Sequence, residues 1–289
     1  MTVLEAIQRG NEVLCAQKVD SSKLQSELLL AHVLKRPRLN LYIDFAHSLS
    51  ASEIAEWEGL LRRRAQGEPL QYILGEAWFC GLRFAVTPAT LIPRPETELL
   101  AEEAWTVIES KLQQAGCVVD AGTGTGCLAI SCAKRYAGCQ VFALDISEDA
   151  LEVARANAKF HEVPNVSFLR SELLASLPRE LAPNLIISNP PYIASKLIQE
   201  LPCEVREHEP LLALDGGESG LVFYERLAAE AFTRLSKPGF LILELGAGQA
   251  DEVNSILQAQ GFSKITVRPD YSGIPRIISA QLAISSPQH

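Results

Sequence analysis

Apolar residues recur at helical spacing throughout the first 75 residues of the chain. Leu24 and Leu28, for example, lie one helical turn apart with polar residues between them. Ser21 and either Ser50 or Ser52 precede such stretches and are expected to be N-caps. The pattern predicts a small helical bundle with elements over Val3–Gln17, Ser21–Leu34, Leu39–Phe45 and Ala51–Gln66.

The spacing of apolar residues changes after residue 75. Glu76–Thr87 alternates around a Cys-Gly centre, which predicts a β-hairpin. From Cys117 onward apolar runs alternate with helical patterns, which indicates a mostly parallel sheet covered on both faces. The turn-like stretch Pro269–Pro275 joins the last two runs and predicts an antiparallel hairpin at the end of the sheet. Seven strands are expected over Cys117–Asp120, Gln140–Asp145, Val166–Arg170, Leu185–Ser188, Phe240–Leu245, Ile265–Arg268 and Arg276–Gln281. Helices are expected over Gly126–Arg135, Glu148–His161, Gly220–Leu235 and Ala250–Gln260.

The charge divides at the same place as the pattern. The 289 residues carry 26 Lys and Arg against 35 Asp and Glu, a net charge of −9. Residues 1–75 contain nine of each sign, so the remainder carries the whole excess. We expect a helical domain over 1–75, a β-hairpin linker over 76–90 and an α/β domain over 91–289. An acidic chain is a poor binder of nucleic acid, because phosphate contacts need clustered basic residues.

Composition narrows the possible locations and ligands. No apolar run approaches the length of a membrane span, and residues 1–19 lack the features of a secretory signal. The seven cysteines form no C-x-x-C pair, and His208 has no second histidine or cysteine near it. We therefore expect a cytoplasmic protein with reduced thiols and no metal site. Its oligomeric state cannot be read from the sequence, and a monomer is assumed.

A glycine-rich turn follows the first strand of the α/β region. Gly122, Gly124 and Gly126 alternate with Thr123 and Thr125 between a strand and a helix, so backbone can approach a ligand closely. The spacing fits neither a dinucleotide fingerprint nor a P-loop. An acidic residue ends the next strand, about 20 residues further on, where a carboxylate binds the hydroxyls of a ribose.

That acidic residue is Asp145. It could alternatively support the start of the helix at Glu148, so the two features together favour a nucleoside-containing cofactor without naming one.

The second motif follows the fourth strand and consists of Asn189, Pro190, Pro191 and Tyr192. Ligands of open α/β sheets bind outside the carboxyl ends of strands, which places this motif and the glycine turn on one rim. The prolines remove two N–H donors, leaving the Asn189 side-chain oxygen and the Pro190 carbonyl as acceptors. Two acceptors beside an aromatic face suit a planar NH2 group.

These motifs together resemble the methyltransferases that use S-adenosylmethionine to modify planar nitrogens, and more specifically the release factor glutamine N5-methyltransferases (the HemK/PrmC type). The resemblance covers nearly the whole length. It also rests on Leu91–Glu98 (LIPRPETE), on Glu204–Arg206 with Glu209-Pro210, and on Asp270–Gly273 (DYSG). It implies a Rossmann-like methyltransferase sheet whose substrate is held partly by the helical domain.

The resemblance also implies roles for particular residues. Gly122 to Gly126 would contact the methionine part of S-adenosylmethionine, Asp145 the ribose, and Glu172 with Leu173 the adenine, with S-adenosylhomocysteine as product. The partners would be class I peptide chain release factors, whose Gly-Gly-Gln segment presents the glutamine. Pro93 to Glu98 would form part of the rim of the active site. The alternative is that they form only a rigid turn into a helix beginning near Thr97.

The residues suggest how such a reaction proceeds. Asn189 and Pro190 are expected to accept the two N–H bonds of the substrate amide and aim its nitrogen at the methyl group, while Tyr192 packs on the amide plane. Asn189 would also border the cofactor. Alternatives are a ribosomal-protein glutamine methyltransferase, a nucleic-acid adenine N6-methyltransferase, which would need a basic channel, and a noncatalytic nucleoside-binding module.

Overall fold

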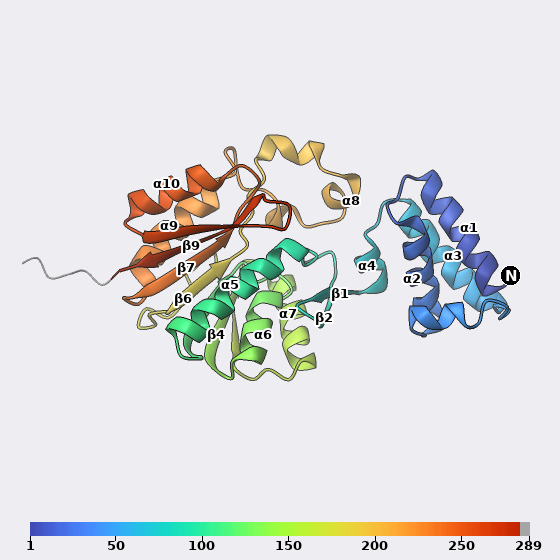
Figure 1. Cartoon of the computed structure of the whole chain (residues 1–289), viewed down its shortest axis with the longest axis horizontal. Coiled ribbons are helices and arrows are strands. Elements are labelled where there is room, and N and C mark those ends of the chain that lie inside the picture. The colour runs from blue at the N-terminus through green and yellow to red at the C-terminus, as the bar shows by residue number, and fades with distance from the viewer. Residues whose placement is uncertain (284–289) are drawn as a thin grey trace, which may run out of the picture. The chain divides into compact units, whose positions relative to one another are not determined.

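The computed structural model describes residues 1–283, which form two compact units (Figure 1). The first unit contains Met1–Glu76 together with Pro202–His208. The second contains Ala77–Leu201 and the described residues from Glu209 onward. The short segment Pro202–His208 thus groups with residues far from it in sequence, which no pattern in the sequence indicates.

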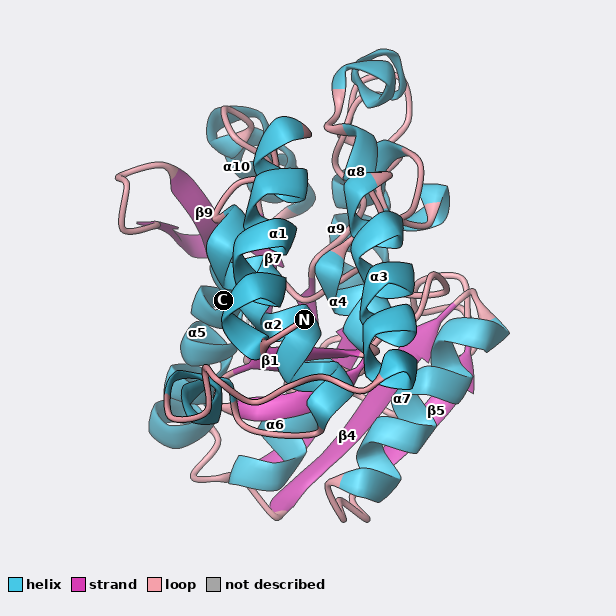
Figure 2. Cartoon of the chain, turned by 90° about the vertical axis from the view of Figure 1, so that its right-hand side faces the viewer, coloured by secondary structure: helices cyan, strands magenta, loops and turns pink. Residues whose placement is uncertain are grey.

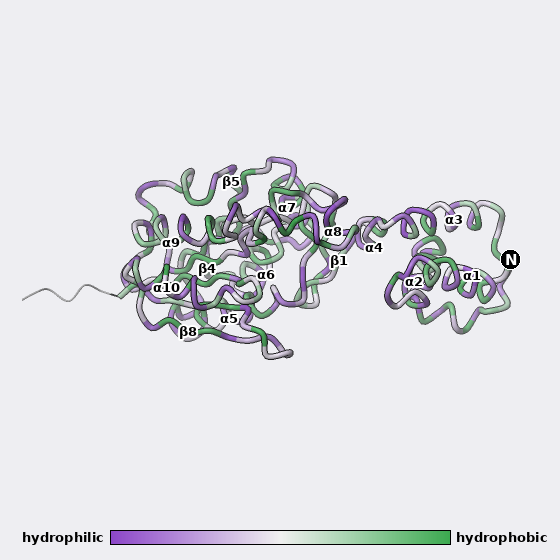
Figure 3. Tube along the Cα trace, turned by 90° about the horizontal axis from the view of Figure 1, so that it is seen from above, coloured by the Kyte–Doolittle hydropathy of each residue, from purple (hydrophilic) through white to green (hydrophobic). Residues whose placement is uncertain are grey.

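The first unit is a helical bundle with an apolar core. Hydrophobic and hydrophilic stretches alternate along α1 and α2 (Figure 3), and Leu14, Leu29 and Trp57 are completely buried. Ser50 caps α3 through a capping box with Glu53, as expected for one of the two candidate serines. The elements are α1 (Val3–Ala16), α2 (Ser22–Leu34), η1 (Arg38–Tyr42), α3 (Ala51–Ala65), α4 (Leu70–Leu74) and α8 (Cys203–Arg206).

Two expectations about this unit are wrong. Ser21 makes no side-chain capping bond to α2, because its backbone is left-handed with φ 50°. The run of charge at Arg62–Arg64 predicts a solvated helix end, because blocks of like charge usually face water. Arg64 is instead buried. It donates to Gln25 Oε1 at 2.6 Å and to Glu204 Oε2 at 2.8 Å. This ion pair attaches the segment Pro202–His208 to α3.

The second unit contains the predicted sheet. Its seven strands lie in the order β5-β4-β3-β6-β7-β9-β8, parallel except for β9, which is antiparallel to both of its neighbours. The expected terminal hairpin is therefore confirmed, and each predicted strand is present. The strands are β3 (Ala115–Ala121), β4 (Gly138–Asp145), β5 (Val166–Arg170), β6 (Leu185–Ser188), β7 (Gly239–Glu244), β8 (Ser263–Pro269) and β9 (Pro275–Leu282).

Helices cover both faces of this sheet, and α6 and α7 run beside β4 and β5 in Figure 2. Successive strand residues point to opposite cores: Val118 packs with α5, α6 and α7, whereas Val119 packs with α9 and α10. The long helices are α5 (Pro95–Lys111), α6 (Cys127–Arg135), α7 (Glu148–Phe160), α9 (Val222–Arg234) and α10 (Ala250–Gln260). Short helical turns η2 (Ser195–Glu200) and η3 (Leu211–Ala213) follow β6.

The predicted hairpin forms as β1 (Glu76–Phe79) and β2 (Leu82–Ala85). Its turn residues Cys80 and Gly81 have φ values of 49° and 74°, as a tight two-residue hairpin turn requires. Phe79 and Phe84 are fully buried in the core under α5 and α6, which anchors the hairpin to the α/β unit.

Two further features bear on function. Across residues 1–283, the chain has no helix with the length and apolar character needed to cross a membrane. Within the same residues there is no cluster of three or more His, Cys, Asp or Glu that could hold a metal ion.

Candidate active site

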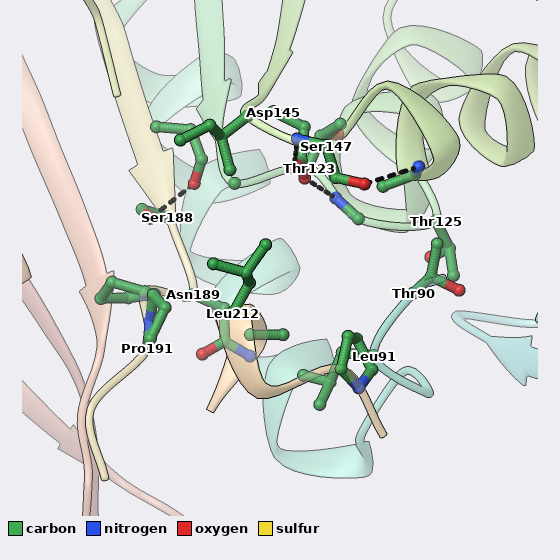
Figure 4. A pocket seen from close by; sticks show the side chains of 18 of the residues that line it. Thr90, Leu91, Thr123, Thr125, Asp145, Ser147, Ser188, Asn189, Pro191 and Leu212 are labelled. Carbon is green, nitrogen blue, oxygen red and sulfur yellow. Dashed lines mark hydrogen bonds between the residues drawn. The ribbon is translucent and has the colours of Figure 1, made fainter. Parts of the chain in front are cut away.

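A cavity of about 220 Å³ lies in the α/β unit where β3, β4, β5 and β6 end (Figure 4). Parallel strands place their carboxyl ends on the same edge of a sheet, so the loops that follow them converge there. Residues Ala89–Leu91 and the start of α5 complete the wall. The glycine turn and the Asn-Pro-Pro motif, separate in sequence, therefore border one space.

The glycine turn leaves room for a ligand. Gly122 and Gly124 have φ values of 77° and 53°, and a Cβ atom added to either would meet no atom within 4 Å. Thr123 and Thr125 line the cavity beside them. Gly126 differs, because an added Cβ would lie 2.9 Å from Ile130 Cδ1. It lies outside the cavity lining, where it allows α6 to begin against its neighbours.

Asp120 holds the turn from beneath. Its carboxylate Oδ2 accepts hydrogen bonds from Thr123 Oγ1 at 2.6 Å and from the Ala129 N–H at 3.1 Å. The side chain is fully buried, and this burial raises its pKa to about 7 despite the two hydrogen bonds. The loop geometry thus depends on a buried acid.

Asp145 lies at the end of β4 and lines the cavity. Its Oδ2 accepts from the Gly124 N–H and its Oδ1 from the Ser147 N–H, both at 2.9 Å. Ser147 Oγ in turn caps α7 by accepting from the Ala150 N–H. Burial raises the pKa of Asp145, although its backbone hydrogen bonds oppose the shift. Each carboxylate oxygen keeps a further lone pair for a ligand hydroxyl.

The wall after β5 contains both residues expected near adenine. Glu172 and Leu173 line the cavity, and Glu172 Oε1 accepts from Arg226 Nη2 at 2.6 Å. Phe223 and Arg226 of α9 also line it, and sequence reasoning missed both. No local motif marks them, since they reach the cavity only because α9 packs on the sheet.

Asn189 lines the opposite side of the cavity at the end of β6. Its Nδ2 donates to Thr97 Oγ1 at 3.2 Å, and Thr97 Oγ1 donates to Glu244 Oε2 at 2.6 Å. Burial raises the pKa of Glu244 to about 7, partly opposed by the hydrogen bond from Thr97. The Pro93–Glu98 segment was expected at the rim, but Glu244 was not singled out, because it is 147 residues from Thr97.

Pro190 and Pro191 line the cavity, whereas Tyr192 lies outside its lining. The Tyr192 ring packs against the α9 side of the core, and burial raises its pKa to about 12. Gln249 Nε2 donates to the Tyr192 carbonyl oxygen at 3.1 Å. Contact between the Tyr192 ring and a substrate therefore stays a prediction.

Arg94 and Glu209 form an ion pair between two further segments on which the family resemblance rests. Arg94 lines the cavity, and its Nη2 lies 2.5 Å from Glu209 Oε1. The Glu209 side chain is almost completely buried, whereas the Arg94 side chain is 32% exposed, so solvent reaches this ion pair from the arginine side. Pro93 also lines the cavity, and the expectation of a rim formed by this segment is consistent with both positions.

Comparison with known proteins extends this picture. Residues 5–75 match the PrmC N-terminal domain and residues 97–242 the methyltransferase small domain. A release factor glutamine methyltransferase of Geobacter sulfurreducens is 38% identical over 281 residues, covering 97% of both chains. One of Chlorobaculum tepidum is 39% identical over 285 residues, covering 96% of both.

The similarity of this chain to a solved structure supports the assignment of the fold only. The crystal structure of a methyltransferase from Pyrococcus furiosus has a TM-score of 0.53 and 20% identity, covering 71% of this chain and 91% of that one. The near full-length similarity to the curated relatives carries the assignment further than the fold does. The chain belongs to the release factor glutamine methyltransferase family.

Proposed function

We propose that this chain transfers the methyl group of S-adenosylmethionine to the side-chain amide nitrogen (N5) of the glutamine in the Gly-Gly-Gln motif of class I peptide chain release factors. One observation carries the proposal. One cavity is bordered by a glycine turn with room for a ligand, by Asp145 and by Asn189, and 97% of the chain is covered by its similarity to a release factor glutamine methyltransferase. A cytoplasmic location, where release factors work, accompanies this proposal.

The cavity residues fit the cofactor. Gly122 and Gly124 leave open space beside the turn for the methionine part, and the acceptor capacity of Asp145 suits ribose hydroxyls. Glu172 and Leu173 line the same cavity and would border the adenine. When bound, S-adenosylmethionine supplies an electrophilic methyl group on a sulfonium. The chain itself then has to bind and aim the substrate.

Aim matters because an amide nitrogen is a weak nucleophile whose lone pair is delocalised into its carbonyl. Asn189 Oδ1 and the Pro190 carbonyl would accept the two N–H bonds of the substrate amide and orient its nitrogen. Such alignment supplies much of the rate gain of a two-substrate reaction. The same acceptors stabilise the positive charge that grows on the nitrogen, since they are preorganised before it develops. Water then takes the released proton.

Two other substrates remain to be tested against this one. A ribosomal-protein glutamine presents the same amide, and adenine presents a similar planar amino group. The net charge of −9 disfavours nucleic acid, because the phosphate backbone needs basic contacts. A protein substrate with basic surfaces suits the acidic α/β unit better.

The test uses the full chain with methyl-labelled S-adenosylmethionine and, in separate reactions, a purified class I release factor, ribosomal protein or DNA. Mass spectrometry then locates the label. We expect it on the Gly-Gly-Gln glutamine, and a release factor with alanine at that position serves as the matched control. Label on DNA, or none on a release-factor glutamine, would contradict the proposal.

A further inference from the structure

A buried chain of hydrogen bonds runs behind the Asn189 side chain. Asn189 follows β6, Thr97 lies in the first turn of α5, and Glu244 ends β7. The Asn189 Nδ2 to Thr97 Oγ1 distance is 3.2 Å, and the Thr97 Oγ1 to Glu244 Oε2 distance is 2.6 Å. Thr97 and Glu244 are each only 2% exposed, so water does not compete for these bonds.

The chemistry of the three groups determines which group donates and which accepts in each hydrogen bond. An ionised carboxylate can only accept, and a hydroxyl has one proton to donate. If Glu244 is ionised, the Thr97 proton is committed to it, and the Thr97 oxygen can then only accept from a neighbour. An amide has a donating and an accepting end, and Thr97 therefore selects the donating end of Asn189.

We propose that Thr97 and Glu244 are positioning residues that fix the orientation of the Asn189 amide, so that Oδ1 rather than Nδ2 is presented to the substrate. This inference rests on the proposed function, because only a substrate with N–H bonds to donate requires an acceptor here. A turned Asn189 would set Nδ2–H against the substrate N–H, donor against donor. Thr97 and Glu244 act through Asn189, and neither is assigned a part in the chemical step.

The surroundings of Glu244 make its ionisation state adjustable near neutral pH. Burial and the neighbouring Glu96 oppose the carboxylate, whereas the Thr97 hydroxyl, Arg276 of β9 and Arg94, before α5, favour it. Tyr192 and Tyr224 of α9 also face Glu244. The balance leaves the pKa of Glu244 at about 7. A protonated Glu244 can donate to Thr97, which frees the Thr97 proton to bond Asn189 Oδ1 and turn the amide. Asn189 then presents Nδ2 rather than Oδ1 to the substrate.

The first test compares variants of the full chain in release-factor methylation at saturating cofactor. Thr97→Val keeps the shape but removes the hydroxyl, and kcat is expected to fall about tenfold or more, the scale of one lost buried hydrogen bond. Cofactor affinity, measured by calorimetry, stays near that of the wild type. Thr97→Ser restores the hydroxyl and most of kcat. Thr106→Val, at an exposed threonine of the same helix, is the matched control and leaves kcat unchanged.

The second test is a pH profile, which a merely structural role would not alter. Wild-type kcat is expected to decline as the pH falls below about 7, following protonation of Glu244. Glu244→Gln removes this decline, since glutamine does not titrate. If Thr97→Val does not fold, the profile of Glu244→Gln decides alone.

The outcomes separate the two proposals. Suppose that the wild type methylates the release factor but folded Thr97→Val keeps the wild-type kcat, or that kcat of Glu244→Gln still declines at low pH. Either result overturns the positioning role and leaves the proposed function intact. Absence of release-factor methylation by the wild type overturns both.

Discussion

The two sides of the cavity are held in place by different means. Asp145, on the cofactor side, is fixed by backbone N–H groups of Ser147, two residues along, and of Gly124, on the adjacent turn. Asn189, on the substrate side, is fixed by Thr97, which is 92 residues away, and through it by Glu244. The cofactor side thus depends on backbone geometry that short motifs encode. The substrate side depends on side chains that meet only after α5 and β7 have packed.

The largest effect that tests this contrast is expected for Asn189→Ala. Removing an acceptor aimed at the reacting amide should lower kcat by about 10²–10³-fold, the usual loss for one preorganised electrostatic contact. The Asp145 side stays intact, so cofactor affinity should change little. Methylation kinetics and calorimetry on the same preparation measure the two sides separately. Equal loss of both would mean that Asn189 is structural or mainly a cofactor ligand.

Asp145→Ala should give the reverse result. Loss of charge-assisted hydrogen bonds to a ribose should weaken cofactor binding about 10–100-fold, on the scale of 1.5–3 kcal/mol for bonds to charged groups. Because Asn189 and its supports are untouched, kcat at saturating cofactor should remain near the wild-type value. Calorimetric titration tests the first expectation and kinetics the second. Unchanged affinity with a reduced kcat would remove Asp145 from the cofactor site.

Two glycines of the same turn sharpen the comparison further. Alanine at either Gly122 or Gly126 incurs left-handed backbone strain of about 1–2 kcal/mol. Only Gly126→Ala also meets Ile130 and Ala154, so it should lose more thermal stability, by about a further 1–3 kcal/mol. Gly122→Ala places its methyl group in open space at the cavity and should weaken cofactor binding instead. Thermal unfolding measures the loss of stability and calorimetry the loss of cofactor affinity in the two variants. A greater loss of stability in Gly122→Ala than in Gly126→Ala would contradict the prediction.

A pH-dependent effect on stability is expected at Asp120, outside the two walls of the cavity compared above. Its pKa is raised from 3.8 to about 7, so between these values the folded chain binds more protons than the unfolded chain. Its contribution to the free energy of unfolding is therefore fully present below pH 3.8 and declines as the pH rises through about 7. Asp120→Asn should flatten this decline by at most about 1.4 kcal/mol per unit of pKa shift. Denaturant unfolding at pH 5 and pH 8 gives the free energy of unfolding of the wild type and of Asp120→Asn. An equal change in this free energy between the two pH values in both proteins would contradict a raised pKa of Asp120.

Much of the architecture follows from local pattern. Each predicted strand of the sheet is present within two residues of its expected ends, and α10 has the predicted bounds. These elements are bounded by glycine, proline or polar turns, and their apolar residues have a single period. The expected start of a helix near Thr97 was displaced to Pro95, because proline fits the first helical position. Helix α4 was missed because it is only five residues long.

Among the candidate site residues, the motifs indicated the loops but not all of their neighbours. Gly122, Gly124, Asp145 and Asn189 line one cavity because each lies at or shortly after the carboxyl end of a strand of the same sheet. Gly126 and Tyr192 belong to the same motifs but lie outside the lining, since packing against the core decides which way each one faces.

The sequence alone therefore determined the α/β sheet, the strand ends that carry its motifs, and the family to which the chain is similar. Periodicity and short-range hydrogen bonding encode these features within a few residues. Only the tertiary structure decided that Glu244 stands behind Thr97 and Asn189, that Phe223 of α9 reaches the cavity, and that Arg64 is buried against Glu204. Each of those contacts joins residues distant in sequence, and no local pattern records a meeting that packing alone creates.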